Sequence, residues 1–199
     1  MNKKFFKSKA LIISSALIIS ASTIGGIAYA KYVSKVTGEG GMMPIAKWSF
    51  LVNDKEDVMD KISLGRESYN AKKISDGVIA PGTSGTFDIT INAKGTQTGV
   101  DYTVEFPQTS NKPTNMYFKV GDKTCKSFFE LGKALSGSFD ADDTEKTVTK
   151  TVQWIWDYQT TNNGKTAEEN DAIDTAEGKD AYNFGFNVEV TGTQVRPVK

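Results

Sequence analysis

The clearest structural signal in the chain is Thr86-Phe87-Asp88-Ile89-Thr90-Ile91-Asn92-Ala93, in which polar and apolar side chains alternate without a break. Successive side chains of a β-strand point to opposite faces of the sheet, so the four apolar residues of this stretch share one face. That pattern predicts a strand that is apolar toward the core and polar toward solvent. Pro81-Gly82, just upstream, is a turn signal that precedes the strand.

The same period of two recurs along the chain. It is visible in residues 100–106, 147–158 and 182–190, and shorter strands are expected at 45–52 and 116–120. Residues 128–131 fit either a strand or a short helical turn, and 54–64 is the best helical candidate. Many short antiparallel strands joined by Gly-rich turns predict an all-β fold, either an antiparallel β-sandwich or a barrel.

Two tryptophans, Trp154 and Trp156, fall on the same face of the expected strand at 147–158. They share that face with Val148 and Val152, which favours packing in the core. The alternative is an exposed aromatic platform for a carbohydrate.

The first thirty residues have the pattern of an export signal. Four lysines lie among residues 3–9, an apolar segment follows from 10 to 27, and it ends at Ala28-Tyr29-Ala30. A basic start, an apolar middle and an A-x-A end are typical of a helical secretory signal peptide, with cleavage between Ala30 and Lys31. The alternative is an uncleaved membrane anchor, because residues 10–30 are long enough to span a bilayer. We therefore divide the chain into a signal peptide (1–30), a flexible N-terminal segment (31–44) and a β-sandwich domain (45–199).

Composition excludes several classes of function. Four of the 24 basic residues lie in the signal, so 20 remain against 24 acidic residues, which argues against nucleic acid as a partner. Histidine is absent, which removes the usual general base and the commonest metal ligand, and we expect no enzymatic activity. With Cys125 as the single cysteine, no internal disulfide can form. We expect Cys125 to be a half-buried residue at the start of a strand; the alternative is a thiol available for intermolecular pairing.

The segment 159–180 is expected to be a polar, acidic loop between two strands. Oxygen ligands from such a loop suit calcium. The candidate ligands are Glu169, Asn170, Asp171, Asp174 and Asp180. Their spacing does not match an EF-hand loop, so a solvated, flexible loop is the competing interpretation. Two of its carboxylates could also act as a glycosidase acid and base, but nothing in the pattern selects a pair.

Five short stretches resemble one family of exported proteins. They are Lys31-Tyr32-Val33, Ala46-Lys47-Trp48-Ser49-Phe50, Ile79-Ala80-Pro81-Gly82-Thr83-Ser84-Gly85-Thr86-Phe87, Asn170-Asp171-Ala172-Ile173-Asp174-Thr175 and Val190-Thr191-Gly192-Thr193-Gln194. With these stretches the chain resembles the TasA/camelysin-like proteins of Gram-positive bacteria, whose signal peptides are processed by a SipW-type signal peptidase.

The resemblance implies a jelly-roll β-sandwich and a place in surface fibres or the biofilm matrix. Fibres of that family grow when the N-terminal segment of one subunit completes a sheet of the next. Residues 31–37 would be the donor strand here, with Tyr32, Val33 and Val36 as its apolar residues, and 38–41 a flexible hinge. A disordered leader is the alternative. The peptidase label that some camelysin-type proteins carry is not transferred, because this chain has no histidine and no recognisable metal triad.

The sequence therefore predicts a secreted structural protein of the cell surface or biofilm matrix. Its expected partners are signal peptidase during export and then further copies or related matrix subunits. Contact with the membrane is expected only through an uncleaved signal. The alternative is a secreted β-sandwich binding module for a surface polymer or protein, stabilised by calcium if the acidic segment binds it.

Overall fold

A ten-residue antiparallel ladder between β3 (Thr83–Asn92) and β8 (Thr147–Trp156) is the longest strand pairing of the structure. The structure is a computed structural model that describes residues 44–108, 110–159, 164–180 and 184–198. The register runs from Thr83 opposite Trp156 to Asn92 opposite Thr147. The alternation read from the sequence is confirmed in β3, where Phe87, Ile89 and Ile91 are buried.

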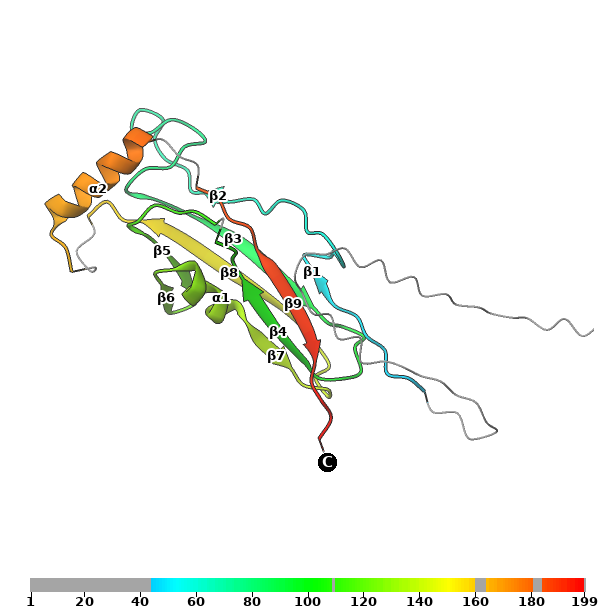
Figure 1. Cartoon of the computed structure of the whole chain (residues 1–199). Coiled ribbons are helices and arrows are strands. Elements are labelled where there is room, and N and C mark those ends of the chain that lie inside the picture. Colours follow the sequence, from blue (N-terminus) through cyan, green and yellow to red (C-terminus); the bar gives the residue numbers. More distant parts are fainter. Residues whose placement is uncertain (1–43, 109, 160–163, 181–183, 199) are drawn as a thin grey trace, which may run out of the picture. The chain divides into compact units, whose positions relative to one another are not determined.

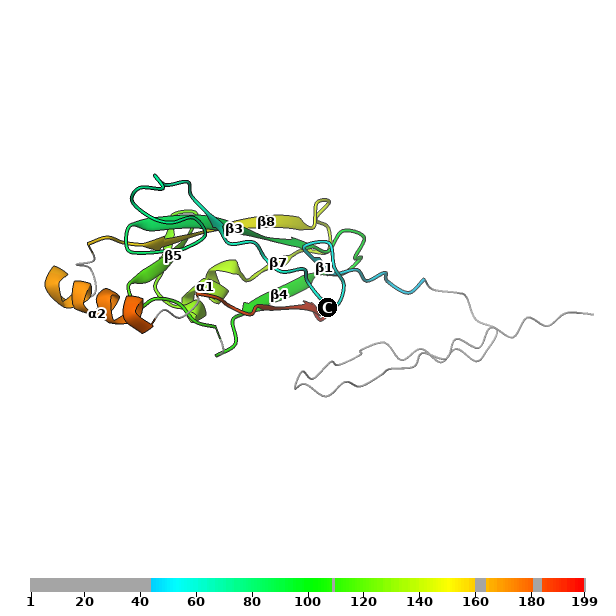
Figure 2. The same cartoon turned by 90° about the horizontal axis from the view of Figure 1, so that it is seen from above.

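The described strands form two antiparallel sheets. The larger has the order β1-β3-β8-β5-β6, with β2 also paired to β3, and the smaller has the order β7-β4-β9. Figure 2 shows β3 and β8 in one layer and β4 in the other. The remaining strand bounds are β1 Leu51–Val52, β2 Gly65–Arg66, β4 Val100–Glu105, β5 Met116–Val120, β6 Lys123–Cys125, β7 Gly137–Phe139 and β9 Glu189–Gln194. The regular secondary structure of the described residues is thus mostly antiparallel β-sheet, as the sequence predicted.

One hydrophobic core lies between the two sheets. Side chains from β3, β5 and β8 meet those of β4 and of the helix α1 (Phe128–Leu135). Trp154 and Trp156 are 1% and 6% exposed, so the prediction that both enter the core is confirmed and an exposed platform there is wrong. Trp48 by contrast is 41% exposed.

Helix α1 settles the ambiguity at residues 128–131 in favour of a helix. Ser127 caps its start, because the Ser127 hydroxyl accepts a hydrogen bond from the Glu130 amide. Gly132 lets the helix lie directly on β4, since a Cβ there would collide with the Val104 carbonyl oxygen. The helix therefore fills the core at the side of β4 (Figure 1).

Helix α2 (Ala167–Asp180) replaces the predicted acidic loop, so that prediction was wrong for these residues. Thr166 and Glu169 form a capping box: the Glu169 amide donates to the Thr166 hydroxyl, and the Thr166 amide donates to the Glu169 carboxylate. Glu168 and Glu169 in the first turn also complement the helix dipole. The helix has no apolar stripe, which is why periodicity did not find it.

Other strand boundaries differ from the sequence prediction. Residues 54–64 contain no helix, and most of 45–52 is irregular before β1. The strand at 147–158 ends at Trp156, and Tyr158 is 71% exposed. The strand expected at 182–190 begins at Glu189, although Phe184, Phe186 and Val188 still pack on the core; Tyr182 lies outside the described residues. No helix in the described part of the chain is long and apolar enough to cross a membrane.

A buried lysine joins two loops at one end of the ladder. Lys146 is 2% exposed, and its amino group donates to the carbonyl oxygens of Thr96 (2.8 Å), Thr98 (3.0 Å) and Ala141 (3.0 Å). A lysine ammonium has three N–H donors, so these three contacts satisfy it completely. The β3–β4 and β7–β8 connections are therefore joined through the amino group of Lys146.

We predict that Gly85→Ala strongly destabilises the protein. A Cβ at Gly85 would overlap the Gly65 carbonyl oxygen and lie 2.6 Å from Cζ2 of Trp154. Overpacking of this kind lowers the free energy of unfolding by about 1–3 kcal/mol. Gly178→Ala is the control, because nothing lies within 4 Å of its Cβ position and alanine favours a helix. Urea unfolding followed by tryptophan fluorescence measures both; equal stability of the two variants would contradict the packing at Gly85.

Candidate docking groove

A groove of about 1060 Å³ opens along one side of the two sheets. One wall is the irregular segment 55–64 that precedes β2, and the other is the segment 184–191 that leads into β9. Phe50 and Val52 also line it. The groove exists because residues 54–64 run without regular structure instead of forming the predicted helix.

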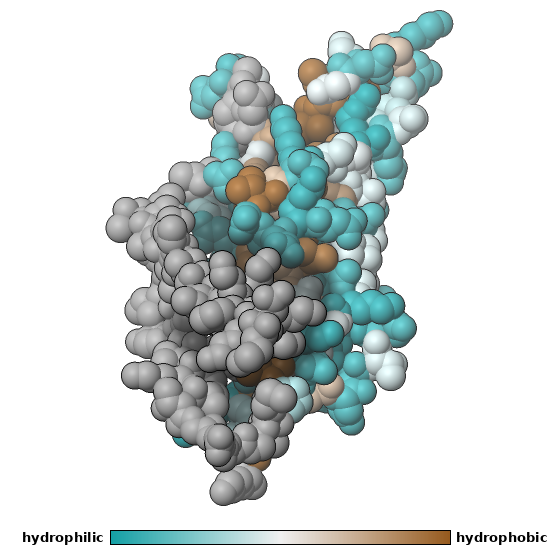
Figure 3. Space-filling model, turned by 90° about the vertical axis from the view of Figure 1, so that its right-hand side faces the viewer, coloured by the Kyte–Doolittle hydropathy of each residue, from teal (hydrophilic) through white to brown (hydrophobic). Residues whose placement is uncertain are grey.

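The floor of the groove is apolar. Half-buried side chains from both walls reach it and pack against the core at the same time. They are Phe50, Met59, Ile62, Leu64, Phe184, Phe186, Val188 and Val190. On the face that Figure 3 draws, hydrophobic residues lie in separate groups among hydrophilic ones. The groove therefore offers apolar surface that the described residues only partly cover.

One strand edge borders this groove. Within the described residues β9 pairs with β4 and has no partner on its other side. The Val195 amide donates to the Gly99 carbonyl oxygen at 2.9 Å, which shows that the backbone groups of Val195 point toward the β4 side. Backbone groups of an antiparallel strand point alternately to either side, so those of Val190, Gly192 and Gln194 point away from β4. This edge can accept a further strand.

The groove also carries a net negative charge. Its lining contains four carboxylates, from Glu56, Asp57, Asp60 and Glu189, against two ammonium groups, from Lys55 and Lys61. Lys55 forms an ion pair with Asp60 at 3.2 Å. A basic segment would therefore be favoured over an acidic one as an occupant.

The residues predicted for signal cleavage and for the donor strand are not part of the described structure. Ala28, Ala30, Lys31, Tyr32, Val33 and Val36 all lie outside the described residues.

The five candidate calcium ligands lie on α2 but divide between its faces. Asn170 is fully buried and Asp174 is 8% exposed, whereas Glu169, Asp171 and Asp180 are exposed. The described residues do not bring three carboxylates of this set within ligand distance of one another. The structure thus divides the five residues between the faces of α2, and Asn170 and Asp174 connect the helix to Asn115, just before β5.

Asp174 holds α2 against the end of β8. Its Oδ1 accepts a hydrogen bond from the Trp156 indole N–H and another from the Asn115 side-chain amide, each at 3.0 Å. Glu177, one turn later, accepts bonds from the Thr114 amide (3.0 Å) and hydroxyl (2.6 Å). Burial raises the pKa of the Asp174 carboxyl, while the two hydrogen bonds oppose that shift. Polar contacts rather than an apolar face therefore attach α2.

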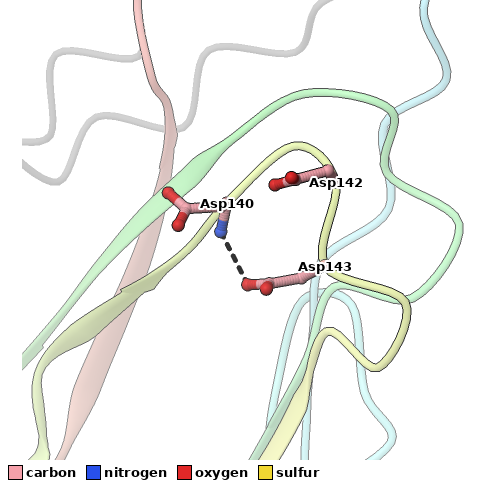
Figure 4. Close-up of side chains that lie close together, drawn as sticks. All are labelled: Asp140, Asp142 and Asp143. Atoms are coloured by element: carbon pink, nitrogen blue, oxygen red, sulfur yellow. Dashed lines mark hydrogen bonds between the residues drawn. The ribbon is translucent and has the colours of Figure 1, made fainter.

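A second acidic group, not predicted from the sequence, lies in the turn between β7 and β8. Figure 4 shows Asp140, Asp142 and Asp143, whose carboxylate oxygens lie within 4.8 Å of one another. All three are exposed. The Asp143 carboxylate accepts a hydrogen bond from the Asp140 amide at 2.7 Å, so turn formation accounts for this contact.

Cys125 is fully buried at the end of β6, not half-buried at a strand start. Burial raises the pKa of its thiol. A buried, protonated thiol is a poor nucleophile, so intermolecular pairing through Cys125 does not fit this fold.

No family model, curated protein or solved structure matches the chain. The resemblance to the TasA/camelysin-like proteins stays a prediction from its residues.

We predict that Asp174→Asn removes a pH dependence of stability. Because the folded-state pKa is raised, the folded protein keeps a proton that the unfolded chain releases above about pH 4. The free energy of unfolding of the wild-type chain therefore falls as pH rises from there through the raised pKa. The asparagine retains an acceptor oxygen but has no charge to desolvate.

The stability of Asp174→Asn relative to wild type should thus increase as pH rises from about 4 through the raised pKa of Asp174, measured by urea unfolding at a series of pH values. Asp180→Asn, an exposed aspartate at the end of the same helix, is the control and should show no such trend. A stability difference for Asp174→Asn that does not change with pH would contradict the expected effect of burial.

Proposed function

We propose that this chain is an exported structural protein of the cell surface or biofilm matrix, and that its copies assemble into fibres by strand complementation. The observation that carries this proposal is the apolar groove beside the edge of β9 that has no partner strand among the described residues. An added strand would satisfy the outward backbone groups of β9 and cover the apolar floor at once. The proposal ascribes no catalytic activity to the chain.

The proposed occupant is the segment 31–37 of a second copy. It contains Lys31 and Lys35 and no acidic residue, which complements the net negative lining of the groove. Tyr32, Val33 and Val36 supply its apolar side chains. Seven extended residues span about 23 Å, enough to run beside the six residues of β9.

Two further features support the same proposal. From β3 onward the chain passes between the two sheets in the order β3, β4, β5–β6, β7, β8, β9, so it crosses the core repeatedly. This alternation supports a jelly-roll sandwich, the fold that the resemblance implies. The signal pattern of residues 1–30 supports a signal helix, processing by signal peptidase and a secreted location.

Removal of residues 31–41 should abolish self-assembly. We expect the chain that begins at Lys31 to form fibres visible by negative-stain electron microscopy, and the chain that begins at residue 42 to stay monomeric in analytical ultracentrifugation. A synthetic peptide of residues 31–37 in excess should cap growth, whereas the same residues in scrambled order should not. Fibres from the shortened chain would overturn the proposed donor.

A proline at the free edge of β9 tests the acceptor side. Gln194→Pro removes an amide that points away from β4 and leaves the apolar floor of the groove intact, so the monomer keeps its β4–β9 ladder while the incoming strand loses a hydrogen bond. We expect fibre growth to slow by at least tenfold in a turbidity or thioflavin-type assay. Ser138→Pro, whose amide by the same alternation points outward from β7 at the opposite edge of the sheet, is the control. Equal effects of the two prolines would contradict docking at β9.

A further inference from the structure

A second pocket lies at the end of the sheets near α2, and the proposed assembly does not use it. It encloses about 580 Å³, a size typical of small-molecule sites. Its lining comes from residues 64–66, the loop 77–79, Pro113, β8, the C-terminal part of α2 and Phe184. Most of its wall is apolar or aromatic, including Leu64, Val78, Ile79 and Trp156.

The sheet register places a charged side chain in this apolar wall. Arg66 of β2 pairs with Gly85 of β3, and Gly85 pairs with Trp154 of β8. Directly paired residues of neighbouring strands share a face, so Arg66 lies on the core side of the sheet together with Trp154. Because Gly85 has no side chain, the Trp154 ring can lie over it. The Arg66 side chain is 15% exposed.

Two hydrogen-bond donors of this wall have no partner in the described structure. They are Nη1 of Arg66 and the indole N–H of Trp154, and both are buried. Trp156, the neighbouring tryptophan of the pocket, differs because its N–H is bonded to Asp174. A buried donor without an acceptor costs about 1–3 kcal/mol, so unpartnered buried donors are rare in folded proteins and point to a missing acceptor.

Arg66 has only weak partners for its charge among the described residues: its Cζ lies 5.4 Å from the centroid of the Tyr69 ring, in a cation–π contact. Its nearest carboxylate belongs to Asp76 at 3.6 Å, and that side chain is 92% exposed, so solvent screens the pair. Glu177 also lines the pocket, but its carboxylate is engaged by Thr114. The pocket therefore combines a cation, unpartnered donors and aromatic walls.

We propose that this pocket binds a small aromatic carboxylic acid, with the carboxylate accepting hydrogen bonds from Arg66 and Trp154. The apolar body of the ligand lies against Val78, Ile79 and Phe184. Because both donor nitrogens are covered, the ligand displaces part of the wall on entry. The α2 side can yield, since the contacts of Asp174 and Glu177 that hold this helix are side-chain hydrogen bonds.

The test uses 2-naphthoate as the probe and its neutral counterpart 2-naphthamide as the matched control ligand, titrated into the full chain by calorimetry. We expect 2-naphthoate to bind at least tenfold more tightly than the amide, because a charge-assisted hydrogen bond contributes more than a neutral one. The proposal would be overturned if 2-naphthoate showed no saturable binding up to about 10 mM, or if the two ligands bound with equal affinity.

Variants locate the site. Arg66→Gln should weaken 2-naphthoate binding about tenfold or more. Arg66→Lys keeps the charge but loses the planar fork of donors, so its affinity should lie between those of wild type and Arg66→Gln. Trp154→Phe should weaken binding about three- to tenfold, because the ring remains and the donor is lost. Arg196→Gln, an exposed arginine near the C-terminal end, is the control and should bind as wild type. Wild-type affinity in Arg66→Gln would contradict the assignment.

A spectroscopic readout keeps the test independent of variant stability. The three tryptophans give three indole N–H signals in a ¹⁵N-labelled chain. We expect the Trp154 signal to move downfield on addition of 2-naphthoate as its proton gains an acceptor, and the signal of exposed Trp48 to stay fixed. A Trp154 signal that does not move at saturation would overturn the role of this donor, whether or not the chain forms fibres.

Discussion

The antiparallel pairing of β3 with β8 is the interaction on which the rest of this molecule is built. In the larger sheet, β1 and β2 attach to β3 and β5 attaches to β8, so this ladder carries the strands on both of its sides. Its inward side chains also form the largest part of the core, from Phe87 to Trp154. The second pocket borders this ladder through Trp154 and Trp156. The groove lies one strand away, beside β1, which pairs with β3.

Buried polar residues fix both ends of β8. Lys146 immediately precedes its first residue and binds three carbonyl oxygens, while Trp156 at its last residue donates to Asp174. Each of these groups would be costly to bury alone, and each is compensated by its partners. Apolar packing thus sets the position of the ladder, and the polar contacts attach the loops and α2 to its ends.

The sequence predicted the parts of this fold that a period of two describes. The strands at residues 83–92, 100–105 and 147–156 alternate clearly, because one face of each meets the core and the other meets solvent or a polar loop. Helix α2 has no such signal, since it is held by Asn170, Asp174 and Glu177 rather than by an apolar stripe. Its capping box at Thr166 and Glu169 was the available signal.

The candidate sites were harder to predict, because both depend on residues that are distant in sequence. Arg66 and Trp154 come together through two strand pairings with Gly85 between them, and no local pattern reports that register. The groove depends on residues 54–64 not forming the helix that their apolar spacing suggested. The acidic residues of α2 were visible in the sequence, but the direction that each one faces follows from the helix.

The burial of Lys146 has a consequence for amine chemistry. Reagents that acylate or cross-link lysines reach a primary amine only when it is exposed and unprotonated, and this one is enclosed by the carbonyl oxygens of two loops. Surface lysines will be modified while Lys146 is spared. Its modification would begin only when the two loops separate, so the labelling of this single side chain reports opening at that end of the molecule.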